Sequence, residues 1–155
     1  MMENMHIHTL QGNPKENLDL LLLADPDETM IDRYLSQSRI FVLDYQGQTA
    51  CQAVVQPVDA QTLELKNLAT AVRFQKRGLA GYMMRWLCEN CPIQYRRMIV
   101  GTSRQGCSFY QRYGFRLFSV VPHFFTDHYS QPIYEQGELC VDLFYLERNC
   151  KEPWE

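Results

Sequence analysis

"RFQKRGLAGY", residues 73–82, is the stretch that decides the fold, because a cationic, glycine-rich turn lies there between an apolar segment and an amphipathic one. From residue 79 to residue 87, apolar side chains recur at helical spacing. A turn from a strand into a helix directs several main-chain N–H groups to one point, where the helix dipole adds partial positive charge. The turn therefore predicts a phosphate-binding site. An ordinary strand-to-helix turn with solvated basic residues would have the same composition.

The strand that precedes this turn, residues 61–70, has an irregular alternation. Leu63 and Leu65 set one phase, whereas Leu68 falls on the opposite phase. A one-residue slip of this kind predicts a β-bulge at residues 66–67. Partial burial of both strand faces would give the same pattern.

The rest of the chain alternates strand and helix patterns, without a repeat or a linker. Further strands are expected over residues 5–10, 39–45, 49–56, 97–102, 115–121 and 139–146. Helices are expected over residues 17–24, 78–90 and 104–113, and another begins at Asp25 as its N-cap. Residues 122–138 show little periodicity and predict a loop. This order predicts one domain, residues 1–155, with an α/β sheet of mixed strand direction.

Composition narrows the class of protein. The 155 residues are 46% hydrophobic and 21% charged, as in a soluble globular domain. A net charge of −3 argues against nucleic-acid binding, and no apolar run approaches the ~20 residues that span a membrane. No secretory signal pattern opens the chain, so its six cysteines are expected to be reduced thiols in the cytoplasm.

Two motifs at the expected separation resemble the GNAT superfamily of N-acetyltransferases. Gln75, Gly78 and Ala80 match the Q/R-x-x-G-x-G/A loop, and "FYQRYGF", residues 109–115, matches a second signature. The resemblance covers residues from about 5 to 146, and residues 20–35 and 123–137 look like segments of a group of small bacterial GNAT proteins. It implies a mixed, mostly antiparallel sheet of six to seven strands, with helices on both faces and a bulged, splayed central strand.

The resemblance implies acetyl-CoA as the acyl donor. Main-chain groups of Leu68 and Thr70, with Ala69 between them, would contact the pantetheine arm, and the Leu68 N–H would stabilise the developing oxyanion. The pyrophosphate would be held by the amides of Gln75, Lys76, Arg77, Gly78, Leu79 and Ala80.

The resemblance also assigns the proton transfers. Tyr110 occupies the position of the usual general acid, which protonates the departing thiolate. Many relatives place a cofactor-binding asparagine seven residues earlier, where this chain has Ser103. Glu64 is the first candidate for the general base, although a solvent-facing strand glutamate would look the same. Glu135 and the histidine pair His123/His128 are its rivals.

The acceptor is expected to be a primary amine of a small molecule or peptide. Tyr134, Glu135 and His128 are candidate contacts with it, because acidic and aromatic side chains attract a cation. No metal is implied, and a homodimer is compatible with the family. A CoA-binding sensor or interaction module without catalysis is the alternative function, and a donor other than acetyl-CoA is a further one.

Overall fold

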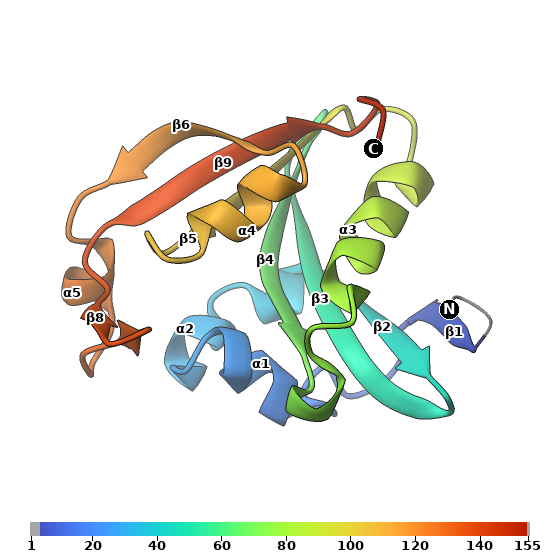
Figure 1. Cartoon of the computed structure of the whole chain (residues 1–155), viewed down its shortest axis with the longest axis horizontal. Helices are drawn as coiled ribbons and strands as arrows, with labels where there is room; N and C mark the ends of the chain where they lie inside the picture. The colour runs from blue at the N-terminus through green and yellow to red at the C-terminus, as the bar shows by residue number, and fades with distance from the viewer. Residues whose placement is uncertain (1–3, 155) are drawn as a thin grey trace.

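The computed structural model describes residues 4–154, and a seven-stranded sheet forms its framework (Figure 1). The strands follow the order β1-β2-β3-β4-β5-β9-β6, and every neighbouring pair is antiparallel except β4 with β5. Their bounds are β1 Met5–Thr9, β2 Arg39–Tyr45, β3 Gln48–Asp59, β4 Thr62–Thr70, β5 Arg97–Thr102, β6 Arg116–Val121 and β9 Leu143–Asn149. The mixed, mostly antiparallel sheet is thus confirmed.

Helices cover both faces of this sheet. They are α1 Leu18–Ala24, α2 Glu28–Asp32, α3 Leu79–Asn90, α4 Cys107–Arg112 and α5 Phe124–His128, with short 3₁₀ turns η1 Leu35–Gln37 and η2 Val72–Phe74. Successive strand residues point to opposite faces. On β3, Val54 packs with residues of α1 and α2, whereas its neighbours Ala53 and Val55 pack with residues of α3. The helices α1 and α2 therefore lie opposite α3.

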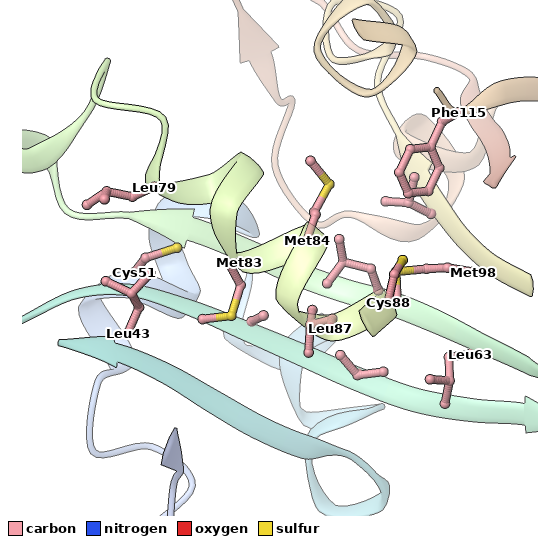
Figure 2. Close-up of a cluster of buried hydrophobic side chains, with 14 of the residues drawn as sticks. Leu43, Cys51, Leu63, Leu79, Met83, Met84, Leu87, Cys88, Met98 and Phe115 are labelled. Atoms are coloured by element: carbon pink, nitrogen blue, oxygen red, sulfur yellow. The ribbon is translucent and has the colours of Figure 1, made fainter. Parts of the chain in front are cut away.

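The amphipathic helix α3 anchors the larger core (Figure 2). Its buried residues Leu79, Met83, Met84 and Leu87 face the sheet, and each contributes about 1.5–3 kcal/mol by leaving water. Gly81 has no side chain, and this allows the ring of Tyr113 to pack against the helix, since a Cβ there would meet that ring. The start of α3 is therefore held rigidly on the sheet.

The β-bulge lies where the sequence predicts it. Val54 of β3 is opposite Asn67, whereas Val55 is opposite Leu65, so Lys66 is the extra residue. Because of this insertion, Leu68 returns to the face of Leu63 and Leu65 and packs against the same core. The parallel pairing of β4 with β5 covers residues 62–65 and 97–100, so beyond the bulge the two strands separate.

A tight hairpin joins β2 to β3, which confirms these two expected strands. Gln46 and Gly47 both have positive φ angles, 54° and 78°, and join Tyr45 to its partner Gln48. Positive φ at both central residues is the geometry of a type I′ turn, which matches the twist of the strands.

Three expectations are wrong in detail. Asp27 caps α2, because its carboxylate accepts hydrogen bonds from the amides of Thr29 and Met30, and Asp25 instead ends α1. The expected loop 122–138 contains α5 and the hairpin of β7 Tyr134–Glu135 with β8 Glu138–Leu139. This hairpin takes up the start of the expected strand 139–146, so β9 begins only at Leu143.

Candidate active site

A cavity of about 810 Å³ opens where β4 and β5 separate. The two strands form its walls from residue 64 to 70 and from residue 100 to 103, the start of α3 and the side of α4 close one end, and the α1–α2 turn and residues 124–135 close the other. In Figure 1, β4 diverges from β5, and α5 and β8 lie beside α2. The bulge at Lys66 is the local cause of the cavity, because it ends the pairing that would otherwise close it.

The free edge of β4 faces this cavity. The amide of Ala71 donates to the Ala50 carbonyl of β3 at 2.8 Å. Main-chain groups alternate between the two edges of an extended strand. The groups of Leu68 and Thr70 therefore point away from β3, and those of Ala69 point toward it. The Thr70 carbonyl accepts a hydrogen bond from Nε2 of Gln75 at 3.0 Å, which ties the strand to the turn that follows.

The turn into α3 presents main-chain donors. Gly78 is the N-cap residue at φ 79°, and no side chain among the described residues caps the helix. The first amides of α3 are therefore available to a ligand. Gln75 differs from the expectation, because its amide donates to the Val72 carbonyl at 3.2 Å, within the turn. The side chain of Leu79 is buried in the core, so only its main chain faces the turn.

Two cations flank the same turn. Lys76 is exposed and has a positive φ of 64°. The guanidinium of Arg77 is exposed and lies over the rings of Phe74 and Tyr45, at 5.7 and 6.0 Å from their centroids. Both positive charges add to that of the helix dipole, so an anion is favoured at this end of the cavity.

Tyr110 lines the cavity from α4. Its ring packs edge-on against Phe109 and Phe115, with centroids 5.0 and 5.6 Å away. Burial, and then the negative charges of Glu135 and Cys51, raise the pKa of the Tyr110 hydroxyl above its ordinary value. The hydroxyl is therefore protonated at neutral pH and can donate a hydrogen bond or a proton.

Ser103 lies at the end of β5, is buried and also lines the cavity. Its Oγ accepts a hydrogen bond from the Gly106 amide at 3.2 Å, in the turn that leads to α4. Ser103 thus helps to orient the helix that carries Tyr110.

Glu64 lies on β4, two residues before the bulge, and lines the cavity. Its carboxylate is largely buried and pairs with Nζ of Lys66 at 3.3 Å. Burial, and the nearby Glu64 carboxylate, raise the pKa of Tyr145 on β9 to about 12. The structure therefore brings Glu64 and Tyr110 to the same cavity.

Of the three residues expected to contact the acceptor, two line the cavity and one does not. Tyr134 and Glu135 line the cavity, where Glu135 accepts a hydrogen bond from the Cys140 thiol at 3.5 Å. His128 is exposed, is not among the cavity residues, and its ring contacts that of Phe124 in a tilted arrangement, with 4.8 Å between centroids. His123, the N-cap residue of α5, also lies outside the cavity lining.

A polar cluster at the end of the cavity formed by the α1–α2 turn was missed by sequence reasoning. The Asp25 carboxylate accepts hydrogen bonds from the hydroxyls of Tyr34 at 3.1 Å and Tyr129 at 2.8 Å. Asn67 donates through Nδ2 to the same Tyr34 oxygen at 3.2 Å. No local signal could have found the cluster, because Asp25 and Tyr129 are 104 positions apart in the chain.

The described residues contain no group of three histidine, cysteine or acidic side chains placed to hold a metal ion. None of their helices has the length and hydrophobicity needed to cross a lipid bilayer. The described cysteines are all free thiols.

Comparison with known proteins identifies the class. Residues 36–117 match the model of an acetyltransferase (GNAT) domain. The chain is 29% identical over 149 residues to the uncharacterized N-acetyltransferase YvbK of Bacillus subtilis (strain 168), covering 94% of this chain and 96% of that protein.

Two solved structures agree with this. A GNAT family acetyltransferase from Elizabethkingia anophelis with acetyl-CoA bound is 34% identical, with a TM-score of 0.87 over 95% of this chain and 99% of that one. A Bacillus subtilis acetyltransferase in complex with CoA is 28% identical, with a TM-score of 0.84 over 94% and 98%. The chain belongs to the GNAT family of acetyltransferases and is an N-acetyltransferase.

Proposed function

We propose that the protein transfers an acetyl group from acetyl-CoA to a primary amine, by direct attack within a ternary complex. The observation that carries this proposal is the bulge at Lys66, which opens a cavity between β4 and β5 directly beside the uncapped start of α3. The solved relatives with acetyl-CoA or CoA bound support acetyl-CoA as the donor.

The free edge of β4 would hold the pantetheine arm. The outward main-chain groups of Leu68 and Thr70 can pair with its amides as a neighbouring strand would, and Ala69 contributes to the cavity wall. The Leu68 amide is our candidate for stabilising the negative charge that develops on the thioester carbonyl oxygen.

The turn into α3 would hold the pyrophosphate. Amides of Gly78, Leu79 and Ala80 supply donors, and Lys76 and Arg77 supply positive charge. The side chain of Gln75 would support this turn through its hydrogen bond to Thr70, since its own amide is already bonded.

Tyr110 and Glu64 would perform the proton transfers. A primary amine is mostly protonated at neutral pH, so Glu64 would accept its proton, directly or through water, before attack. A C–N bond then forms, the C–S bond breaks, and the thiolate receives a proton from the Tyr110 hydroxyl. Ser103 would act through the position of α4, and Tyr134 and Glu135 would contact the acceptor.

The first test is thermal unfolding with acetyl-CoA, with NAD and ATP as controls. A ligand at a hundred times its Kd stabilises by ~2.7 kcal/mol, so acetyl-CoA alone should raise Tm clearly. Release of CoA is then measured with a panel of primary amines. If saturating acetyl-CoA leaves the Tm unchanged, the cavity does not bind the donor.

The substitution Tyr110→Phe tests whether Tyr110 is the general acid that protonates the departing thiolate. We expect kcat to fall by about 100-fold or more, with the acetyl-CoA-induced shift preserved. Tyr113→Phe is the matched control, because it removes a hydroxyl from a ring that packs on α3 outside the cavity lining. Equal kcat values in both variants would exclude Tyr110 as the acid.

A further inference from the structure

Asn67, Tyr34, Asp25 and Tyr129 form a continuous chain of buried hydrogen bonds at one end of the cavity. The chain joins four separate segments: β4, the residues after α2, the α1–α2 turn and the residue after α5. Asp25 is 9% exposed and Asn67 is 4% exposed. Both nevertheless line the cavity, so a ligand within it can reach them.

Every polar hydrogen on the side chains of these four residues is already donated in a hydrogen bond. Each tyrosine hydroxyl donates to one oxygen of Asp25, and Nδ2 of Asn67 donates to Tyr34 and to the Leu21 carbonyl at 3.0 Å. The amide oxygen of Asn67 is buried and has no partner in the described part of the chain. These four side chains can therefore accept further hydrogen bonds but cannot donate any. A buried acceptor without a donor costs free energy, which a ligand rich in N–H groups would recover.

Asp25 is also a buried carboxylate without a cation, since none of the ion pairs formed within residues 4–154 includes it. A nearby cation, Lys66, lies 5.4 Å from the centre of the Tyr34 ring and is paired with Glu64. A buried charge held only by neutral donors favours a cationic ligand. Phe124 and Phe125 line the same cavity, and aromatic rings attract cations.

We propose that Asp25 and Asn67 bind a second, non-reacting ammonium group of the acceptor, so that the enzyme prefers short diamines to monoamines. This inference rests on the proposed function and names the class of acceptor. An ammonium group has three donors and no acceptor, which is the complement of this cluster.

The bulge sets the spacing between the two amine positions. Because Lys66 is an extra residue, Glu64 and Asn67 face the same side of β4, opposite Leu63 and Leu65. Glu64 and Asn67 are opposite Gln56 and Val54, which are two residues apart on β3, so about 7 Å of strand separates them at a rise of about 3.3 Å per residue. The reacting amine at Glu64 and the second ammonium at Asn67 are therefore within reach of one short aliphatic chain.

The test compares three acceptors with the same four-carbon chain: butylamine, 4-amino-1-butanol and 1,4-diaminobutane. With the full-length protein and saturating acetyl-CoA, we expect kcat/KM for the diamine to exceed that for the other two by about tenfold or more, as for hydrogen bonds to a charged group. Asp25→Asn should reduce the diamine value by a similar factor and leave butylamine unchanged. The matched control is Asp19→Asn, which removes the same charge from the exposed side of α1 and should change neither value.

Each outcome decides the inference. Equal kcat/KM for the three acceptors in the wild type would overturn it without any variant, and so would an equal loss in both aspartate variants. Retention of the acetyl-CoA-induced Tm shift shows that Asp25→Asn is folded. If acetyl-CoA binds but no amine is acetylated, the proposed function fails, and calorimetric titration of 1,4-diaminobutane into the protein with CoA decides instead. Binding that Asp25→Asn abolishes supports the diamine site, and no binding to the wild type overturns it.

Discussion

Substituting Gly78 by alanine separates the geometry of the turn from its use as a ligand site. Gly78 has φ 79°, and a Cβ there would meet no atom of the described chain within 4 Å. The left-handed conformation costs an alanine about 1–2 kcal/mol. The less flexible unfolded chain offsets about 0.4–1 kcal/mol of that. We therefore expect a net destabilisation of about 1 kcal/mol, or about 2–4 °C in Tm.

Gly47 provides a matched control. It has φ 78° in the β2–β3 hairpin, and a Cβ there would likewise meet no described atom within 4 Å. Gly47→Ala should therefore cost the same stability, but Gly47 lies in the β2–β3 hairpin and not at the start of α3. Only Gly78→Ala should weaken acetyl-CoA binding, by about tenfold, because its methyl group occupies the space where the pyrophosphate would approach the main chain.

The assay is urea unfolding of both variants, followed by calorimetric titration with acetyl-CoA. The stability losses establish that the two substitutions strain the backbone equally. If both variants then bind acetyl-CoA as tightly as the wild type, Gly78 is required only by the turn, and the pyrophosphate position is refuted.

Three other predictions concern the base, the contact between helices and the buried aspartate. Glu64→Gln should lower kcat/KM about 100-fold at pH 7. The difference in kcat/KM from the wild type should shrink as pH rises, because the free amine becomes more abundant. An unchanged pH profile would exclude Glu64 as the base. Gly81→Ala should destabilise the protein by about 1–3 kcal/mol, because the new methyl group clashes with Tyr113. In a Tyr113→Leu background, the same substitution should instead stabilise the protein by up to about 1 kcal/mol. A double-mutant cycle measured by urea unfolding would detect this change of sign. Burial raises the pKa of Asp25 above 3.8, so the native state binds this proton more tightly than the unfolded state does; stability from this group is present below pH 3.8 and is lost as pH rises through the folded pKa. Urea unfolding at several pH values should therefore show Asp25→Asn gaining stability relative to the wild type over that range, and parallel curves would contradict the burial argument.

The bulge and the turn that are proposed to hold the donor could be predicted because their signals are local. A period-two pattern that changes phase at residues 66–67 is visible in one strand, and a glycine before an amphipathic helix is visible in one turn. Both features depend on residues that are neighbours in sequence. The structure confirms the bulge and the turn at those positions.

The polar cluster that is proposed to hold the acceptor could not be predicted, because its contacts are long-range. Asp25 was interpreted as a helix cap from its immediate neighbours Pro26 and Asp27, although its partner Tyr129 is 104 residues away. The segment 122–138 looked irregular because its elements are too short for periodicity to show: α5 has five residues, and β7 and β8 have two each. Such short elements depend on tertiary contacts, such as Ser130 with Asp27 at 3.3 Å, for their position.

One inserted residue connects the two proposed sites. Without the bulge, Lys66 would pair in a regular ladder, Asn67 would turn toward the core under α3, and β4 would continue to pair with β5. With it, Asn67 turns toward Tyr34 and Asp25, while the main chain of Leu68 and Thr70 loses its strand partner. The same bulge therefore frees the edge proposed for the donor and orients the amide proposed for the acceptor, so a single irregularity in the pairing of β4 aligns the two proposed sites.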